Sequence, residues 1–244
     1  MSRFFLPRHS LQGSFVVLTG ENAAHARVLR LKAGDEAVVC DGEGNDFHCV
    51  VSDVSPGQVS LVVRSSCPAA AEPKLQASVL MAFAKADKLE HVVQKATELG
   101  ACEIVAFPSA RCVSRPDAQG LKRKLERWQK IAAAAAEQSG RGRIPHVRAA
   151  ESFGQALQWA AEKEFAALLY ENEQKTTFRS QIERAGFSSA AVMTGPEGGF
   201  DAAEVCAAQE AGLSICTLGP RILRCETAPL CALTALMYAH GELD

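Results

Sequence analysis

Two glycine-bearing loops near the C-terminus carry the residues best suited to chemistry. Residues 195–199 read Gly-Pro-Glu-Gly-Gly, and residues 218–228 read Leu-Gly-Pro-Arg-Ile-Leu-Arg-Cys-Glu-Thr-Ala. Each loop follows a short apolar run that predicts a strand, at 190–193 and 213–218, and each precedes a helical pattern. A glycine loop between a strand and a helix N-terminus turns backbone N–H groups and the positive end of a helix dipole toward a ligand. The two loops are therefore predicted to form two walls of one pocket.

The first loop limits the kind of ligand. Neither loop matches a phosphate-binding fingerprint, and Glu197 would repel a phosphate. The pocket would suit a ligand that is apolar, neutral or cationic near this carboxylate, such as adenosine joined to a sulfonium amino acid. In the alternative interpretation both loops are tight turns, and their glycines serve only to adopt a positive φ. The occurrence of two long loops after consecutive predicted strands favours a site.

The second loop adds charged side chains. Arg221 and Arg224 flank two apolar residues, and Glu226 and Thr227 follow them. Thr227 is predicted to be the N-cap of a helix with Pro229 in its first turn. Guanidinium groups in such a loop suggest contacts to an anion or a nucleobase, whereas Glu226 could simply complement the helix dipole.

The composition is that of an ordinary soluble globular protein, with 48% hydrophobic and 22% charged residues among 244. Its nine cysteines form no Cys-x-x-Cys pair, which predicts reduced thiols and neither a disulfide framework nor a metal site. No apolar run reaches the length of a signal-sequence core or a membrane span. We therefore expect a cytoplasmic protein with no membrane partner.

The net charge of −2 hides an uneven distribution of charge. Residues 111–148 hold ten Lys or Arg and three Asp or Glu, a local balance of +7, so the rest of the chain carries −9. Such segregation suits a protein that presents one face to a polyanion. The alternative is a solvated helix face, because residues 121–130 are plainly amphipathic.

The pattern of elements predicts two domains. Residues 1 to about 66 have strand composition and turn residues between the runs, which predicts a small β-barrel. The predicted elements are strands at 14–18, 36–40, 46–51 and 59–63 and a helix at 22–31. Residues 67–73 contain two prolines around small residues and predict a linker.

After the linker, apolar runs alternate with helical patterns, which predicts an α/β fold whose parallel sheet binds ligands at the carboxyl ends of its strands. Strands are expected at 77–84, 103–107, 165–170, 190–193 and 213–218, and helices at 89–99, 118–138, 201–212 and 230–240. Two of these helices carry candidate capping boxes, Asp87 with Glu90 and Asp201 with Glu204.

The two loops together resemble those of the SPOUT, or trefoil-knot, methyltransferases. Further segments resemble, more narrowly, the bacterial 16S ribosomal RNA (uracil-N3)-methyltransferase family. These are Arg3-Phe4-Phe5, His25 to Arg30, Lys85 to Gly100, Trp128 to Ile131 and Ala135 to Arg141. Two positions depart from the family pattern: Cys225 stands where Thr or Ser is expected, and Ala110 stands where an acidic residue is usual.

The resemblance implies a PUA-like RNA-binding barrel at residues 1–70 and a knotted SPOUT domain at residues 74–244. It also implies a homodimer, with the last helix at the interface, that acts on 16S ribosomal RNA or the 30S subunit. The cofactor would be S-adenosylmethionine, without a metal. The residues implied to bind it are Leu169, Tyr170, Glu171, Thr194, Gly195, Pro196, Glu197, Gly198, Gly199, Leu218, Gly219, Ile222, Leu223, Thr227 and Ala228.

Methyl transfer to uracil N3 requires the loss of the N3 proton, so the site needs a base or a group that stabilises the uracil anion. Arg224 is the candidate for orienting the base and stabilising its charge, and Glu226 is the candidate base or loop organiser, with Glu197 third. N3 lies on the Watson–Crick edge, so the target must be unpaired or flipped out. The candidate RNA contacts are Arg3, His25, Arg27, Arg30, Arg111, Arg115, Arg141 and Arg143, each of which could equally be a solvated surface charge.

Other functions remain open at this point. A ribose 2′-O-methyltransferase or a different RNA-base methyltransferase would share the knotted domain. A PUA-type RNA-binding protein with a decayed donor pocket would share the barrel, although the intact glycines of both loops argue against decay. A generic nucleotide-binding enzyme is disfavoured because the chain lacks a phosphate-binding loop.

Overall fold

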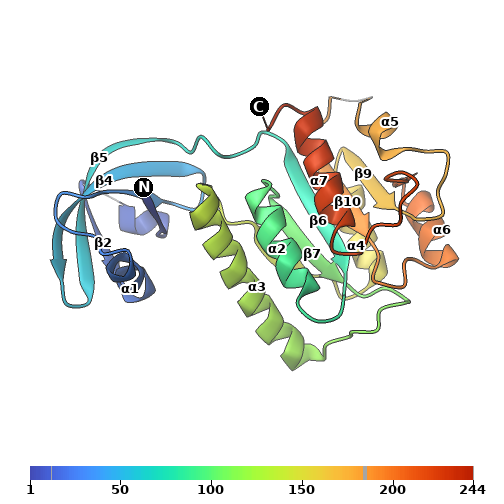
Figure 1. The fold of residues 1–244 in the computed structure, drawn as a ribbon, viewed down its shortest axis with the longest axis horizontal. Coiled ribbons are helices and arrows are strands. Elements are labelled where there is room, and N and C mark those ends of the chain that lie inside the picture. Colours follow the sequence, from blue (N-terminus) through green and yellow to red (C-terminus); the bar gives the residue numbers. More distant parts are fainter. Residues whose placement is uncertain (12, 184–185, 244) are drawn as a thin grey trace. The chain divides into compact units, whose positions relative to one another are not determined.

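The structure is a computed structural model that describes residues 1–11, 13–183 and 186–243. The chain forms two compact units (Figure 1). Unit 1 comprises residues 1–72 and 136–144, and unit 2 comprises residues 73–135 and 145–244. A segment from the middle of the sequence thus belongs to the N-terminal unit.

Unit 1 is built on a five-stranded mixed sheet with the strand order β1-β3-β4-β5-β2. β1 runs parallel to β3, and the other pairs are antiparallel. Its elements are β1 (Ser2–Phe5), a 3-10 helix η1 (Arg8–Leu11), β2 (Phe15–Thr19), α1 (Gly20–Val28), β3 (Glu36–Cys40), β4 (Asn45–Ser55) and β5 (Gln58–Pro68). The four predicted strands and the helix are confirmed, β1 is additional, and the expected barrel is an open half-barrel with edge strands β1 and β2.

The linker prediction was wrong at its N-terminal end. β5 continues to Pro68, which pairs with Asn45 of β4, so the segment from residue 67 starts inside the sheet. The sheet tolerates a proline there because Pro68 is the last residue of the strand. Its missing N–H therefore costs the sheet a single hydrogen bond at the end of the ladder. Glu72, near the end of the expected linker, accepts backbone hydrogen bonds from Gly142 and Arg143.

Unit 2 contains a six-stranded sheet with the order β11-β9-β10-β6-β7-β8, and every strand pair is parallel. The strands are β6 (Gln76–Ala82), β7 (Glu103–Phe107), β8 (His146–Ala149), β9 (Phe165–Leu169), β10 (Ser189–Thr194) and β11 (Ser214–Cys216). The helices are α2 (Lys88–Glu98), α3 (Ala118–Ser139), α4 (Phe153–Ala161), α5 (Phe178–Ile182), α6 (Ala202–Glu210) and α7 (Ala228–Ala239). The predicted parallel α/β sheet is confirmed, while β8, α4 and α5 were not foreseen.

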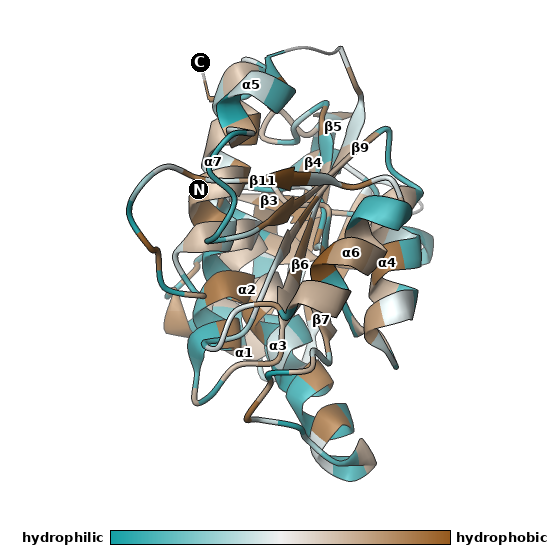
Figure 2. Ribbon diagram, turned by 90° about the vertical axis from the view of Figure 1, so that its right-hand side faces the viewer, coloured by the Kyte–Doolittle hydropathy of each residue, from teal (hydrophilic) through white to brown (hydrophobic). Residues whose placement is uncertain are grey.

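Helices cover both faces of this sheet. α2 and α7 lie on one face and α4 and α6 on the other, with the apolar strands between them (Figure 2). β6 is buried at every position after its first residue, as expected for a strand covered on both sides. The apolar stripe of α2 is buried as predicted. Trp128 of α3 is only 2% exposed, so its indole packs in the interior.

The capping predictions had different outcomes. Asp201 and Glu204 form the predicted capping box of α6. Asp87 and Thr227 occupy the N-cap positions of α2 and α7, but neither side chain makes a capping hydrogen bond. Glu90 instead accepts a hydrogen bond from Arg127 of α3, so the α2 capping box was wrong.

No described helix is long and apolar enough to cross a membrane. Among the described residues, no group of three or more His, Cys, Asp or Glu side chains could hold a metal ion.

Candidate active site

Three loops meet at the carboxyl ends of β9, β10 and β11. β9 lies between the other two strands in the sheet, so the two glycine loops are separated by the loop that begins at Tyr170 and Glu171. The Glu171 carboxylate lies against Gly199, so a Cβ there would force this exposed side chain to move. Gly195 is similarly close to Gly199, whose backbone has a φ of +67°. These contacts explain why glycines are required in the first loop.

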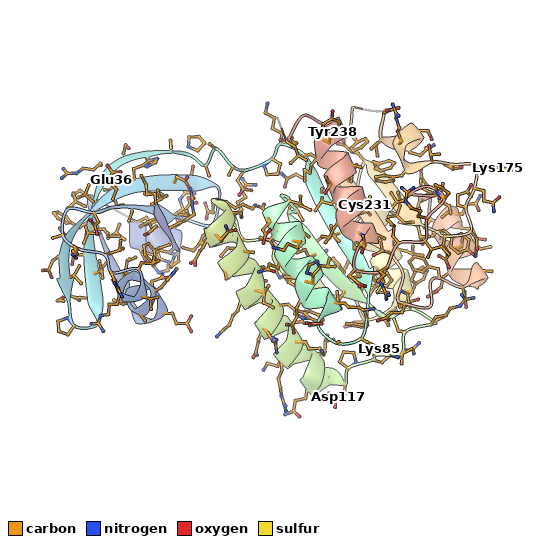
Figure 3. The ribbon with its side chains drawn as sticks, viewed as in Figure 1. Glu36, Lys85, Asp117, Lys175, Cys231 and Tyr238 are labelled. Carbon is orange, nitrogen blue, oxygen red and sulfur yellow. The ribbon has the colours of Figure 1, made fainter. Side chains whose placement is uncertain are left out.

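Lys88, the first residue of α2, connects the two glycine loops. Its ammonium lies 3.0 Å from Glu197 Oε1 in the first loop and 3.5 Å from Glu226 Oε2 in the second. The same ammonium is 3.6 Å from Cys225 Sγ, and the Cys225 thiol donates to Glu226 Oε2 at 3.3 Å. The backbone N–H of Lys85, in the loop after β6 (Figure 3), donates to Glu197 Oε1 at 3.0 Å. We call Lys88, Glu197, Cys225 and Glu226 the loop cluster.

The electrostatics of the loop cluster favour ionised carboxylates. Burial acts to raise the pKa of Glu197 and Glu226, but hydrogen bonds and the Lys88 charge outweigh it and hold both pKa values below the usual 4.5. The hydrogen bond to Glu197 raises the pKa of Lys88. Burial raises the pKa of the Cys225 thiol to about 11, so the thiol stays neutral and can donate to Glu226 as the expected hydroxyl would. With two carboxylates and one ammonium, the loop cluster carries a net charge of −1.

The second loop holds Arg224 through its backbone. The Arg224 carbonyl accepts hydrogen bonds from the N–H groups of Thr227 and Ala228, at 2.9 and 3.0 Å, at the start of α7. The Arg224 guanidinium is exposed and forms no hydrogen bond or ion pair with a described residue. Ile222 is 84% exposed. The loop therefore presents a free cation and an apolar side chain.

A fourth loop, after β7, is attached to the first glycine loop. The Arg111 guanidinium donates to the carbonyl of Gly198 at 3.1 Å. Glu204 of α6 accepts hydrogen bonds from Ser109 Oγ and from the backbone N–H of Ala110, at 3.0 and 2.8 Å. The missing acidic side chain at Ala110 therefore does not leave this loop without an anchor. Arg115 donates to the carbonyls of Ser109 and Ala110 and remains exposed.

The residues expected to bind the cofactor are not equivalent in the structure. Glu171, Gly195, Glu197, Gly198 and Gly199 come together as described. Leu169 and Thr194 are buried at the ends of their strands, and the Thr194 hydroxyl donates to the Leu80 carbonyl at 3.4 Å. The remaining expected residues take no part in the loop cluster. Ala228 begins α7, and the others lie in the loops; they are Tyr170, Pro196, Leu218, Gly219, Ile222, Leu223 and Thr227.

Two of the expected RNA contacts are held inside unit 1. Arg3 donates two hydrogen bonds to the Asp46 carboxylate, at 2.6 and 2.9 Å. The side chain of Arg141 is 3% exposed and pairs with Glu72 at 2.9 Å. Both arginines therefore have structural roles, and their position argues against a direct contact with RNA.

The other expected RNA contacts of unit 1 reach the surface. Arg27 and Arg30 are exposed at the end of α1, and Arg27 donates to the Ser55 carbonyl at 3.2 Å. His25 stacks edge-on against Phe4. Arg143 is exposed and donates to the Glu43 carbonyl at 3.0 Å.

Sequence reasoning missed Lys88 and Glu204 as organisers of the site. Both contact residues about a hundred positions away in the chain, at separations of 109 and 95 residues. The sequence did place Lys88 within the segment from Lys85 to Gly100 that resembles the methyltransferase family, which was the available indication of its importance.

Comparison with known proteins identifies the family. A family model described as an RNA methyltransferase domain matches residues 71–237, and one described as an RNA methyltransferase PUA domain matches residues 18–64. The chain is 38% identical over 229 residues to ribosomal RNA small subunit methyltransferase E of Bacillus subtilis, with 91% of this chain and 89% of that protein covered. For the protein of that name from Mycobacterium tuberculosis, the identity is 34% over 237 residues, covering 95% and 89%.

A solved structure has the same fold. The ribosomal RNA small subunit methyltransferase E from Neisseria gonorrhoeae, bound to S-adenosyl methionine, is 29% identical to this chain, and the match covers 98% of this chain and 97% of that one with a TM-score of 0.86. The resemblance seen in the sequence is thus confirmed over nearly the whole chain: this protein belongs to the RNA methyltransferase family that includes ribosomal RNA small subunit methyltransferase E.

Proposed function

We propose that this protein transfers the methyl group of S-adenosylmethionine to N3 of a uridine in 16S ribosomal RNA. The observation that carries the proposal is the meeting of the two glycine loops at one sheet edge around Lys88. Similarity to small-subunit RNA methyltransferases, one of them bound to the cofactor, supports the donor and the class of acceptor.

The residues at the sheet edge fit S-adenosylmethionine. Glycines at 195 and 199 keep side chains out of the space between the loops, and the net charge of −1 on the loop cluster suits a sulfonium. The Glu171 carboxylate forms no hydrogen bond or ion pair with a described residue, so it is free to accept hydrogen bonds from hydroxyl groups. When bound, the cofactor supplies an electrophilic methyl group.

The protein's own residues must then prepare the acceptor. Uracil N3 becomes a nucleophile only when its proton leaves and negative charge spreads onto the carbonyl oxygens. Arg224, with its free guanidinium, stabilises that charge and orients the ring. Glu226 is ionised at neutral pH and can accept a proton, but its low pKa makes it a weak base. We therefore assign most of the acceleration to alignment and to Arg224.

The RNA contacts that we retain are exposed cations. In unit 2 these are Arg111 and Arg115, whose loop is bonded to the first glycine loop. In unit 1 they are Arg27, Arg30 and Arg143, and we also retain the partly exposed His25. Arg3 and Arg141 are left out because both are held in salt bridges. A ribosomal substrate also implies action in the cytoplasm.

The quaternary structure we propose is a homodimer through α7. One side of α7 packs on α2, β6 and β10, while Cys231, Thr234 and Tyr238 on its other side are exposed (Figure 3).

The division into a PUA-like domain at 1–70 and a SPOUT domain at 74–244, and the trefoil knot of the latter, stay predictions.

A labelled methyl-transfer assay tests the proposal. The substrates are 30S subunits and naked 16S RNA from a strain lacking this modification, followed by nucleoside mass spectrometry. The expected product is 3-methyluridine. A different methylated nucleoside would contradict the acceptor, and cofactor binding without transfer would contradict catalysis. Failure to bind S-adenosylmethionine would reduce the protein to an RNA-binding function.

A further inference from the structure

Lys88 contacts both glycine loops at once, which distinguishes it from ordinary surface lysines. Lys95 lies two turns further along the same helix and, among the described residues, forms its ion pair with Glu98 alone, three residues away, at 2.7 Å. Lys88 instead joins Glu197 and Glu226, which follow different strands and are not neighbours in sequence. An ion pair within one helix adds little to a site, whereas a cation between two loops restricts their relative positions.

The segment that carries Lys88 is itself constrained. Ala86 has a φ of +56°, a left-handed conformation that is strained for an L-residue other than glycine. The neighbouring Lys85 N–H donates to the same Glu197 oxygen that Lys88 contacts. A backbone held in this conformation between two contacts presents the Lys88 ammonium from a fixed position rather than from a free loop.

A direct role of Lys88 as a base does not fit its surroundings. The hydrogen bond to Glu197 and the charges of both carboxylates raise the pKa of Lys88 above its usual 10.5, although burial opposes this. The amine is therefore protonated at any pH at which the enzyme works and cannot accept a proton from uracil.

We propose that Lys88 is a positioning residue whose ammonium clamps the two glycine loops together, so that the donor-binding surface is formed before the donor arrives. This inference rests on the proposed function, because it assigns Lys88 to the same site. Without Lys88, Glu197 and Glu226 would face each other as like charges, and the loops would separate. Binding would then have to restore their order, which lowers affinity for the donor.

Two ligands that differ in charge distinguish a geometric role of Lys88 from a purely electrostatic one. S-adenosylmethionine carries a sulfonium charge and S-adenosylhomocysteine does not, yet both need the same loop geometry. Loss of a geometric clamp weakens both ligands by a similar factor. Loss of mere charge compensation makes the site more negative, which tightens binding of the cation and leaves the neutral ligand unchanged.

The experiment is isothermal titration of both ligands with wild type, Lys88→Met, Lys88→Arg and the control Lys95→Met, with melting temperatures to verify folding. We expect Lys88→Met to weaken both ligands about tenfold, a loss equivalent to about 1.4 kcal/mol. Lys88→Arg should stay within about threefold of wild type, because a guanidinium can span the same two carboxylates, and Lys95→Met should bind as wild type does.

A double-mutant cycle with Glu226→Gln gives the second readout. Removing the second negative charge should restore part of the affinity that Lys88→Met loses, since the repulsion between the loops disappears. Tighter S-adenosylmethionine binding by Lys88→Met, or unchanged binding of both ligands, would overturn the inference. If wild type itself binds neither ligand, the proposed function fails instead, so the two failures are distinguishable.

Discussion

The Glu171 carboxylate lies directly against the Cα of Gly199, so the loop after β9 and the loop after β10 touch where residue 199 has no side chain. Gly199 also has a φ of +67°. We predict that Gly199→Ala costs about 1–2 kcal/mol of backbone strain and forces the exposed Glu171 side chain to rotate away from this loop. The expected result is a loss of S-adenosylmethionine binding of tenfold or more, measured by titration, with a lower melting temperature.

Gly154→Ala is the matched control for this change. Gly154 lies in α4, and a Cβ there would meet only Ser152 Oγ, at 3.9 Å. Alanine has the higher helix propensity, so the control should be neutral or slightly stabilising, by at most about 1 kcal/mol. Equal binding by both variants would show that the space at residue 199 has no role in the site.

Arg224→Ala tests the assignment of the acceptor chemistry. Because the Arg224 backbone, not its side chain, supports the start of α7, the substitution should leave the loop folded. We expect kcat to fall at least a hundredfold, as for loss of one group that stabilises transition-state charge, while the affinity for S-adenosylmethionine stays within about threefold of wild type. Single-turnover methylation of 30S subunits measures the first quantity and titration the second.

Arg221→Ala controls for the general loss of positive charge. Arg221 is exposed in the same loop, three residues away. Arg221→Ala should affect the KM for the RNA substrate more than kcat, because an exposed cation contributes to RNA attraction rather than to the chemical step. Retained turnover by Arg224→Ala would remove Arg224 from the chemistry.

The sequence predicted the parts of the fold that depend on local pattern. The segment Glu103–Phe107, apolar after its first residue, was predicted with the correct strand bounds, and Asp201 with Glu204 indicated the correct cap. β8 was missed because it is a four-residue edge strand with alternating polar residues. α4 was missed because it is only nine residues long and carries Gly154 in its first turn, a residue that indicates a loop rather than a helix.

The candidate site was predictable only in its loops. Glycines and charged residues adjacent in sequence marked the two walls, but pairing between distant residues could not be read from spacing. Arg141 illustrates the limit, because a basic residue beside other basic residues suggested RNA contact until the fold brought it to Glu72. Lys88 illustrates the reverse, because nothing near it in sequence reveals its carboxylate partners.

The ion pairs of the loop cluster predict a defined pH dependence. The Glu197 and Glu226 pKa values are lowered, so their contribution to stability is complete above the usual 4.5 and is lost as the pH falls through the folded values. The raised Lys88 pKa keeps its contribution complete below 10.5. We expect wild type to melt about 1–3 °C above Lys88→Met at neutral pH, with a constant difference from about pH 6 to about pH 9 that shrinks below about pH 4.

Differential scanning calorimetry of the two proteins across this range measures the effect. Lys95→Met, tested in parallel, should show a smaller difference from wild type at neutral pH, because its pair is an i,i+3 contact on the helix surface. A wild-type advantage that persists unchanged into acid would mean that Lys88 stabilises the protein by packing rather than by charge.

Tyr238→Glu tests the homodimer. Tyr238 is 73% exposed on α7. A carboxylate placed in a symmetric interface faces its own copy or is buried without a partner, so dimerisation should weaken at least tenfold. Light scattering after size exclusion, over a series of concentrations, gives the mass. The control is Glu210→Gln, an exposed position on α6, which should leave the mass unchanged. A monomeric wild type would contradict the prediction directly.

Arg141→Ala should damage unit 1 rather than RNA binding. The guanidinium is almost fully buried against Glu72. Its loss leaves that carboxylate with the Gly142 and Arg143 N–H groups as its partners in the described part of the chain. Breaking a buried pair costs about 3 kcal/mol, so the melting temperature should fall by several degrees.

Arg27→Ala, at an exposed position, is the control. It should change stability by less than about 0.5 kcal/mol but lower RNA affinity. Thermal melting and filter binding distinguish the two, and an Arg141→Ala protein as stable as wild type with weakened RNA binding would restore Arg141 to the RNA interface.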